Sequence, residues 1–306
     1  MARRRKKGRI VDGLILLNKE SGESSNHVLQ QIKRLYQAQK AGHTGSLDPL
    51  ATGMLPICFG EATKFSQFLL NADKSYRVTG KLGEKTETSD ADGDIIQTKP
   101  VAVTEKQLLR TLKNFEGEIE QIPSMYSALK FEGKPLYKYA REGIEIAREP
   151  RTVHIFELDF ISFDSPYFTL EVECSKGTYI RNLIEDIGDE LGCGAHVTAL
   201  HRNWAGCFNA EEMISKEELE ESFAQNGLAG IDALLLPTDT LTLDFPEVVL
   251  NEEMMYYILH GQPLQLPQSP EQGYIRLYGP QHQFIGIGEI NDDGNVAPKR
   301  IISTQQ

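Results

Sequence analysis

Residues 42–57 read Gly42-His43-Thr44-Gly45-Ser46-Leu47-Asp48-Pro49-Leu50-Ala51-Thr52-Gly53-Met54-Leu55-Pro56-Ile57. This segment holds one carboxylate, one imidazole and three glycines, and no other ionisable side chain. Glycine permits positive φ and lets a ligand approach the backbone closely. Pro49 favours an extended Asp48 and suits the first position of a helix. The segment is therefore predicted to be a glycine-rich loop that ends in Asp48, followed by a short helix or turn.

Asp48 has two interpretations, and they are compatible with each other. An aspartate directly before a proline is typical of the N-cap of a helix, where the carboxylate accepts hydrogen bonds from backbone N–H groups. A single carboxylate in a glycine-rich loop is also suited to nucleophilic catalysis. A residue at a cap position can present its oxygen atoms to a cleft, so the spacing alone leaves both interpretations open.

Four further segments lie around this loop in a fixed order: Asp12–Lys19 (DGLILLNK), Lys74–Val78 (KSYRV), Gln121–Lys130 (QIPSMYSALK) and Cys174–Arg181 (CSKGTYIR). Together with residues 42–57, they resemble the motifs of the TruB-type tRNA pseudouridine synthases. The resemblance extends over nearly the whole chain. It implies an α+β fold with a mixed, mainly antiparallel central sheet flanked by helices, followed by a small C-terminal β-barrel domain of the PUA type.

The resemblance also implies an activity, the isomerisation of uridine-55 in the T-loop of tRNA to pseudouridine. This reaction breaks the C1′–N1 bond, rotates the uracil and joins C1′ to C5, so we expect neither a cofactor nor a metal ion. The target base has to leave its stack before an enzyme reaches it. The expected partner is the T-arm stem-loop of tRNA, and we expect the protein to be a monomer. A tRNA-folding chaperone that grips the same T-arm without obligatory chemistry is the alternative.

Three catalytic residues follow from the resemblance. Asp48 is the nucleophile or its functional equivalent, and Tyr76 stacks on the flipped base and moves a proton. Arg181 pairs with Asp48, because an adjacent cation favours the charged carboxylate. By residue type alone, Tyr76 also suits an ordinary strand aromatic and Arg181 a surface cation at the start of a helix.

Four substrate-binding residues are implied in the same way. Tyr179 and Leu200 pack around the uracil, and His43 enters the gap that the extruded base leaves. Lys19 supports the wall of the pocket. By residue type alone, Tyr179 and Leu200 are more typical of a hydrophobic core, and His43 is typical of a loop histidine.

The charge is distributed unevenly along the 306 residues. The net charge is −12, but residues 1–208 carry 28 basic and 28 acidic side chains, whereas residues 209–306 carry 4 and 16. The first 40 residues carry 10 basic and 3 acidic side chains. Because affinity for nucleic acid depends on local basic surface, this composition permits an RNA partner for the first two thirds of the chain.

Metal-dependent chemistry and a membrane location are not expected. The four cysteines form no CxxC pair, and the H-x-E and P-C-x-x-C signature of zinc deaminases is missing. Asp90–Asp94 has the glycine at the wrong position for a calcium loop, so we predict a hairpin turn there. No apolar run approaches the roughly 20 residues of a membrane span. We expect a cytoplasmic protein with reduced cysteines.

The domain organisation follows from composition, strand spacing and the resemblance. Residues 1–10 are predicted to be a basic flexible tail, residues 11–240 the catalytic domain, and residues 243–303 the PUA-like RNA-binding domain. Within the catalytic domain, the resemblance places a tRNA-gripping insertion at about residues 124–152. A basic-aromatic helix is predicted there over 136–142, because tyrosines among basic residues suit stacking on nucleotides.

Overall fold

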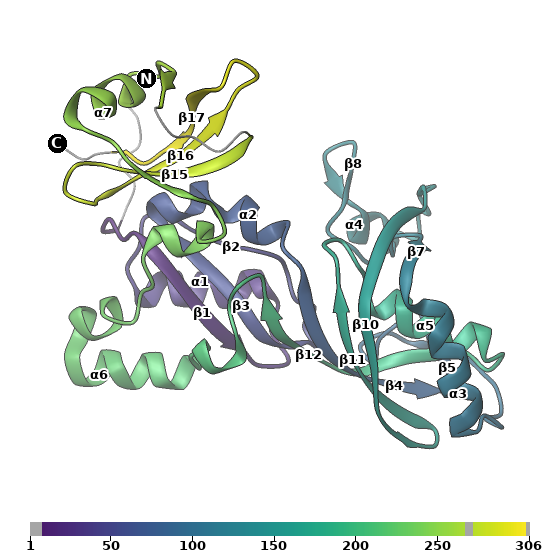
Figure 1. Ribbon diagram of the computed structural model, residues 1–306. Coiled ribbons are helices and arrows are strands. Elements are labelled where there is room, and N and C mark those ends of the chain that lie inside the picture. The colour runs from purple at the N-terminus through teal and green to yellow at the C-terminus, as the bar shows by residue number, and fades with distance from the viewer. Residues whose placement is uncertain (1–7, 267–271, 304–306) are drawn as a thin grey trace.

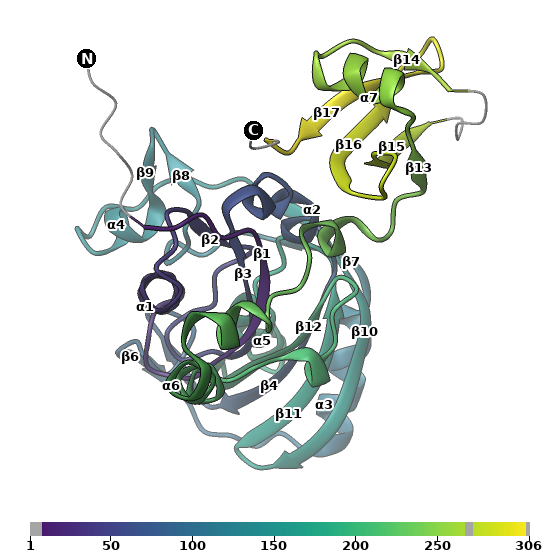
Figure 2. The same cartoon turned by 90° about the vertical axis from the view of Figure 1, so that its left-hand side faces the viewer.

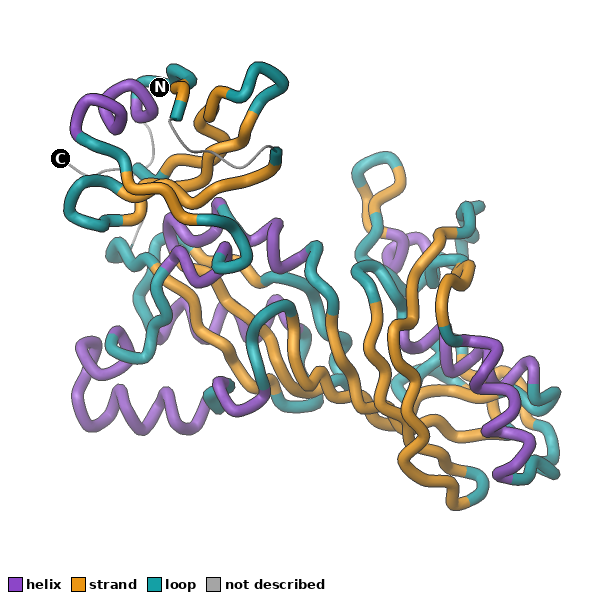
Figure 3. The backbone as a smooth tube through the Cα atoms, in the orientation of Figure 1, coloured by secondary structure: helices purple, strands orange, loops and turns teal. Residues whose placement is uncertain are grey.

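The computed structural model describes residues 8–266 and 272–303 of the chain. It consists of a large unit built on an eight-stranded sheet and a smaller C-terminal unit built on a five-stranded sheet. Figure 1 shows the smaller unit at the upper left, above the strands and helices of the larger one. Figure 3 shows that helices lie along the long sheet of the larger unit, which confirms the predicted α+β class.

The large sheet has the strand order β1-β3-β12-β4-β11-β10-β7, with β2 paired to β3 outside this path. Its strands are β1 (Gly13–Lys19), β2 (Ala41–His43), β3 (Thr52–Phe59), β4 (Lys74–Leu82), β7 (Gly117–Gln121), β10 (Arg151–Asp164), β11 (Tyr167–Cys174) and β12 (Ala195–Ala205). Every pairing is antiparallel except that of β12 with β3, which is parallel at His201 and Arg202. The sheet is therefore mixed and mainly antiparallel, as predicted.

The helices are mostly short, and the chain also contains four short segments of 3₁₀ helix within the described residues. The α-helices are α1 (Ser25–Leu35), α2 (Ser66–Leu70), α3 (Glu105–Leu112), α4 (Leu136–Ala140), α5 (Ile180–Glu190), α6 (Lys216–Asp232, interrupted at Gly227) and α7 (Glu252–Leu259). The 3₁₀ turns are η1 (Gly60–Lys64), η2 (Lys113–Phe115), η3 (Ala210–Glu212) and η4 (Thr238–Thr242). The sequence of residues 61–70 is typical of a single helix, but the structure divides it into η1 and α2.

The central strands are buried on both faces, which places the sheet between two hydrophobic cores. Ile15 and Leu17 of β1 enter the core that α1 and α5 cover, while Leu14 and Leu16 enter the opposite core. Side chains alternate between the two faces of a strand, so one apolar run supplies both cores. Burial on both sides fixes the register of these strands and with it the position of the loop between β2 and β3.

The C-terminal unit has its own core and contacts the large unit through aromatic side chains. Its strands are β13 (Glu247–Val249), β14 (Leu264–Gln265), β15 (Gly273–Tyr278), β16 (Phe284–Ile290) and β17 (Asn295–Ile301). Their order is β13-β15-β16-β17-β14, and α7 packs against them. The rings of Phe65 and Phe284 lie 5.4 Å apart, and those of Phe68 and Tyr274 lie 5.5 Å apart. Figure 2 shows this unit next to α2.

The segment between β7 and β10 projects from the sheet. Gln121 pairs with Arg151 across the two antiparallel strands, so residues 122–150 leave and return at one place. Within the segment, β8 (Lys130–Phe131) and β9 (Lys134–Pro135) form a small hairpin that precedes α4. Figure 1 shows this hairpin beside the end of β10, at the upper right.

The predicted hairpin turn is confirmed, whereas part of the expected N-terminal tail is folded. Asp90–Asp94 lies in the turn between β5 (Glu84–Thr86) and β6 (Ile95–Thr98), which pair as a hairpin. Residues 1–7 of the expected flexible tail lie outside the described residues. Arg9, by contrast, is part of the folded unit, because its Nη1 donates to Asp232 at 2.6 Å and its backbone N–H donates to Gln37.

Candidate active site

The loop that carries Asp48 connects two paired strands. Residues 44–51 lie between β2 and β3, whose register joins His43 to Ile57. The glycine-rich loop is confirmed, but no helix follows it: the chain bends at Pro49 and Leu50 and enters β3 at Thr52. The N-cap interpretation of Asp48 is therefore wrong, and the carboxylate is available for another role.

Two side chains outside the loop hold it in place. The Lys19 Nζ donates to the carbonyl oxygens of Glu20, Pro49 and Ala51 at 2.8, 3.2 and 2.7 Å. The Ser25 hydroxyl donates to the Leu47 carbonyl at 2.8 Å and accepts from the Leu47 N–H at 2.7 Å. Lys19 is 1 % exposed, and burial lowers the pKa of its amine. Lys19 thus fixes the backbone of the residues that directly follow Asp48.

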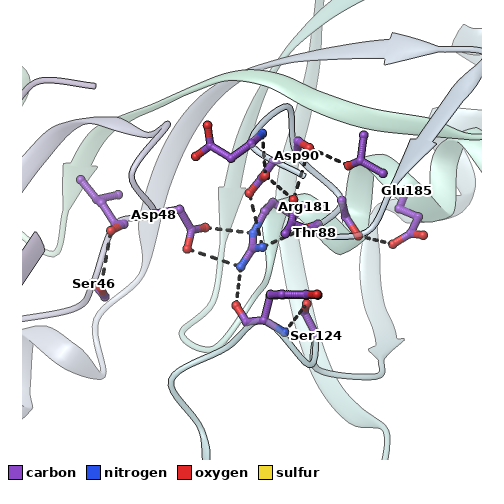
Figure 4. Close-up of polar contacts among 12 residues, drawn as sticks. Ser46, Asp48, Thr88, Asp90, Ser124, Arg181 and Glu185 are labelled. Carbon is purple, nitrogen blue, oxygen red and sulfur yellow. Dashed lines mark hydrogen bonds and ion pairs between the residues drawn. The ribbon is translucent and has the colours of Figure 1, made fainter. Parts of the chain in front are cut away.

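Asp48 forms an ion pair with Arg181, which comes from the first turn of α5. The Arg181 Nε lies 2.9 Å from Asp48 Oδ2, and its Nη2 lies 3.4 Å from Asp48 Oδ1. Figure 4 shows Arg181 between Asp48 on one side and the turn that contains Thr88 and Asp90 on the other. A two-point contact of this kind fixes the direction of the carboxylate as well as its charge.

Arg181 is held by three further groups. Its Nη1 donates to the Thr88 carbonyl at 2.7 Å and lies 3.4 Å from Asp90 Oδ2, and its Nη2 donates to the Tyr126 carbonyl at 2.9 Å. The Arg181 side chain is only 6 % exposed. Since Tyr126 belongs to the segment between β7 and β10, Arg181 connects this projecting segment to the loop of Asp48.

The environment of Asp48 acts on its pKa in opposite directions. Burial raises the pKa of Asp48 above its ordinary value, and Arg181 is the strongest opposing influence. Asp90 and Asp92 add to the rise, and Lys19 opposes it. The side chain remains 39 % exposed, so solvent or substrate reaches it directly. With water and a guanidinium beside it, we expect the carboxylate to be charged at neutral pH.

Tyr76 and Leu200 lie on two paired strands of the large sheet. Both are 8 % exposed, on β4 and β12 respectively, and Val78 of β4 pairs directly with Leu200. Burial raises the pKa of Tyr76, and the charge of Asp48 raises it further. Leu200 and Leu50 line one cavity of about 340 Å³. The structure therefore places Tyr76 near Asp48, and Leu200 in the wall of an open cavity.

Tyr179 is fixed at the start of α5, and His43 lies in β2, directly before the Asp48 loop. Tyr179 immediately precedes α5, and the side-chain amide of Gln121 bonds its N–H at 3.0 Å and its carbonyl at 3.2 Å. His43 is half-buried in β2, and its buried Nδ1 has no hydrogen-bond partner among the described residues. Burial lowers the pKa of His43. The environment therefore favours the neutral form of its ring.

The groups that hold Arg181 were not predicted from the sequence. Asp90 was assigned correctly to a turn, but its contact with Arg181 was not predicted. The Thr88 and Tyr126 contacts use backbone carbonyls, which carry no sequence signal. One signal was available in the sequence. Asp90, Asp92 and Asp94 form an acidic cluster with no Lys or Arg between Lys85 and Lys99, which indicates a cationic partner from elsewhere in the chain.

Across residues 8–266 and 272–303, no group of three or more His, Cys, Asp or Glu side chains is placed to hold a metal ion. The helices of the same residues include none that is long and apolar enough to cross a membrane.

Two relatives of known activity match the chain over nearly its full length. The tRNA pseudouridine synthase B of Vibrio parahaemolyticus is 54 % identical over 309 residues, which cover 99 % of this chain and 98 % of that protein. The protein of the same name from Aeromonas salmonicida is 55 % identical over 307 residues, covering 98 % and 96 %. The chain belongs to the TruB family of pseudouridylate synthases. Residues 33–180 match the N-terminal domain of this TruB family, and residues 181–242 and 246–302 match two C-terminal domains described for it.

A solved structure supports the fold of this TruB-family chain. One chain of the crystal structure of a Cbf5-Nop10-Gar1 complex superimposes with a TM-score of 0.73 at 25 % identity, covering 94 % of this chain and 84 % of the other. A chain in the structure of an H/ACA RNP bound to a substrate RNA has a TM-score of 0.73 at 23 % identity, covering 99 % and 92 %, and shows the shared fold alone.

Proposed function

We propose that this TruB-family enzyme isomerises uridine-55 in the T-loop of tRNA to pseudouridine. The observation that carries the proposal is the Asp48–Arg181 ion pair at 2.9 Å, partly open to solvent and placed beside Tyr76. The full-length relatives named tRNA pseudouridine synthase B support tRNA as the substrate. Because the proposed substrate is a cytoplasmic RNA, we place the protein in the cytoplasm. We also propose that the protein acts as a monomer.

Asp48 acts on the glycosidic bond in this proposal. A charged, aimed carboxylate serves as a nucleophile in covalent catalysis, and Arg181 keeps Asp48 charged and aimed. After the C1′–N1 bond breaks, the uracil rotates within the pocket and C5 replaces N1 at C1′. Tyr76 stacks on the flipped base and exchanges a proton with it. Leu200 and Tyr179 confine the uracil during the rotation.

Substrate binding uses the faces on either side of this pocket. His43 fills the place of the extruded base, and its neutral ring stacks on the neighbouring bases without the desolvation of a charge. Residues 124–152 grip the RNA through Tyr137, Tyr139 and the exposed Lys138 of α4. Residues 11–240 form the catalytic domain and residues 243–303 a PUA-like RNA-binding domain in this assignment.

The direct test is incubation of the purified protein with an unmodified T-arm stem-loop, followed by carbodiimide mapping of pseudouridine by primer extension. We expect a single modified position, the uridine that corresponds to position 55, with full activity in excess EDTA. A stem-loop in which that uridine is replaced by cytidine is the matched control. Modification at other uridines would refute the assigned specificity, and binding without any modification would favour the chaperone alternative.

A further inference from the structure

Arg202 is a buried cation in the middle of the large sheet. It lies on β12, is 1 % exposed, and is among the largest fully buried side chains of the described residues. Its Nε donates to the Met54 carbonyl at 2.7 Å, and its Nη2 donates to the Gly45 carbonyl at 3.2 Å. Both acceptors belong to the segment that carries Asp48, so Arg202 ties both sides of the Asp48 loop to β12.

The charge of Arg202 is not neutralised by a carboxylate. In residues 8–266 and 272–303, no aspartate or glutamate oxygen lies within 4.0 Å of its guanidinium nitrogens. Lys74 is a second buried cation nearby. Burial and the charge of Arg202 together lower the pKa of the Lys74 amine to about 8. An unpaired buried charge is costly, and a neutral side chain such as Gln is able to donate to a carbonyl at a lower cost. The positive charge itself therefore calls for an explanation.

Tyr76 lies directly across from Arg202. The two residues are partners in the antiparallel pairing of β4 with β12, so both side chains project to the same face of the sheet. Such cross-strand neighbours have Cβ atoms about 5 Å apart. Burial raises the pKa of Tyr76, and Arg202 is the strongest influence that lowers it. The other charged or titratable groups that act on Tyr76 are Asp48 from the loop and Cys174 from β11, and both raise its pKa. Lys74 lies two residues away on the same face of β4.

Two glycines, Gly45 of the loop and Gly53 at the start of β3, lie against Arg202. A Cβ atom at Gly53 would lie 2.4 Å from the Arg202 carbonyl oxygen and 2.8 Å from its nitrogen. A Cβ atom at Gly45 would lie 3.5 Å from Arg202 Nη1. The start of β3 is therefore packed directly on the Arg202 backbone, and the Gly45 carbonyl of the Asp48 loop bonds the Arg202 side chain. The loop, Arg202 and Tyr76 thus form one connected unit.

We propose that Arg202 is a positioning residue that acts through Tyr76. Its guanidinium fixes the Asp48 loop and places a positive charge beside the Tyr76 hydroxyl, which enables Tyr76 to accept the proton that leaves uracil C5. This inference rests on the proposed function. Once C1′ is bonded to C5, the C5–H bond breaks and its electron pair re-forms the C5=C6 double bond. The π electron pair of the N1=C6 bond moves onto N1. The phenolate of Tyr76 takes the C5 proton, and N1 takes a proton from Tyr76 or from water. No net charge or electron is lost.

The test compares Arg202→Gln, Arg202→Lys and the wild type in single-turnover assays across a range of pH, with the T-arm stem-loop at saturation. We expect Arg202→Gln to slow isomerisation by about 10²-fold at neutral pH and to shift the rising limb of the rate profile to higher pH. Arg202→Lys keeps a charge and restores part of that shift. Replacing Tyr76 with 3-fluorotyrosine, a more acidic phenol, in the Arg202→Gln background moves the limb back to lower pH.

Arg110→Gln is the control. Arg110 is an exposed arginine in the last turn of α3, outside the segments proposed to react or to bind RNA. We expect its pH profile to match that of the wild type. An Arg202→Gln rate that is lowered equally at every pH, or that 3-fluorotyrosine leaves unshifted, would overturn the inference while the wild type remains active. Absence of pseudouridine from the wild-type reaction would instead refute the proposed function.

Discussion

The Nε of Arg181 lies 2.9 Å from Oδ2 of Asp48, although the two residues are separated by 133 positions in the chain. The arginine is buried and the aspartate is partly exposed, so the pair presents one charged carboxylate to an incoming substrate. The same guanidinium bonds the carbonyl of Tyr126 in the projecting segment. The geometry therefore connects the segment proposed to grip RNA with the carboxylate proposed to react.

Asp48→Asn should abolish isomerisation and leave tRNA binding largely intact. Asparagine keeps the size of the side chain but removes the negative charge and the nucleophile. Single-turnover assays with the T-arm stem-loop measure the chemistry, and filter binding measures the affinity. Asp94→Asn, an exposed change in the turn after Asp90, is the control and should react at the wild-type rate. Turnover by Asp48→Asn would remove Asp48 from the mechanism.

Arg181→Gln should reduce the rate far more than the affinity and should move the acid limb of the rate profile to higher pH. Arg181 lowers the pKa of Asp48, whereas burial raises it. Without the guanidinium, the carboxylate is therefore protonated at a higher pH, and activity is lost earlier as the pH falls. We expect a loss of about 10²-fold at neutral pH.

Arg181→Lys is the companion variant for this prediction. Lysine keeps the positive charge but loses the planar two-point contact, so we expect an acid limb near that of the wild type at a reduced rate. The measurement is the single-turnover rate at each pH, with the dissociation constant determined separately. A weaker dissociation constant with an unchanged rate would contradict the assigned role of Arg181.

The sequence predicted the parts of this fold that have strong local patterns. The fully apolar run at Leu14–Leu17 indicated a buried strand, and the spacing of Val28, Leu29 and Ile32 indicated one face of a helix; both are confirmed by β1 and α1. The residues of β12 gave no such signal, because this strand alternates irregularly between buried and exposed positions and contains bulges opposite β4. The helix α7 was missed as well, because its two tyrosines lie partly in solvent.

The pairing of Asp48 with Arg181 came from the resemblance to a family, not from the pattern of residues. Local chemistry permitted an N-cap at Asp48-Pro49, and this interpretation was wrong because the chain bends at Pro49 and Leu50 and continues as a strand. The long-range pairing of Asp48 with Arg181 has no local signature. Arg202 escaped notice for the same reason, since its partners lie on strands β3 and β4 and are brought together only by the sheet.

Lys19→Met should destabilise the protein and slow the reaction. The amine bonds three backbone carbonyls around the Asp48 loop, and methionine fills similar space without a donor. Leaving these buried carbonyls without a donor should lower the free energy of unfolding by about 1–3 kcal/mol. Part of this loss is offset, because the variant no longer buries a positive charge. Urea unfolding monitors the stability. Lys106→Met on the exposed face of α3 is the control and should unfold within about 0.5 kcal/mol of the wild type.

Lys138→Gln should weaken tRNA binding and flatten its salt dependence. Lys138 is exposed on α4, in the segment proposed to contact RNA. A lysine that neutralises one phosphate contributes about one unit to the slope of log affinity against log salt. Titrations of the T-arm stem-loop at several salt concentrations measure the slope. Lys106→Gln should leave the slope unchanged, and an equal slope for Lys138→Gln and the wild type would exclude α4 from phosphate contact.

Gly53→Ala should be much more damaging than Gly22→Ala, although both glycines have positive φ, +93° and +97°. An alanine in this backbone conformation costs about 1–2 kcal/mol by itself, and we expect this loss of stability for Gly22→Ala, whose added Cβ has no heavy atom within 4 Å. At Gly53 the Cβ meets the backbone of Arg202 at 2.4 Å, so β3 and β12 have to move apart. We expect a loss of about 3 kcal/mol or more together with a slower reaction, because the shift displaces the Asp48 loop. Urea unfolding and single-turnover rates of the two variants provide the comparison. Equal losses would show that the close approach of Gly53 to Arg202 does not constrain the loop.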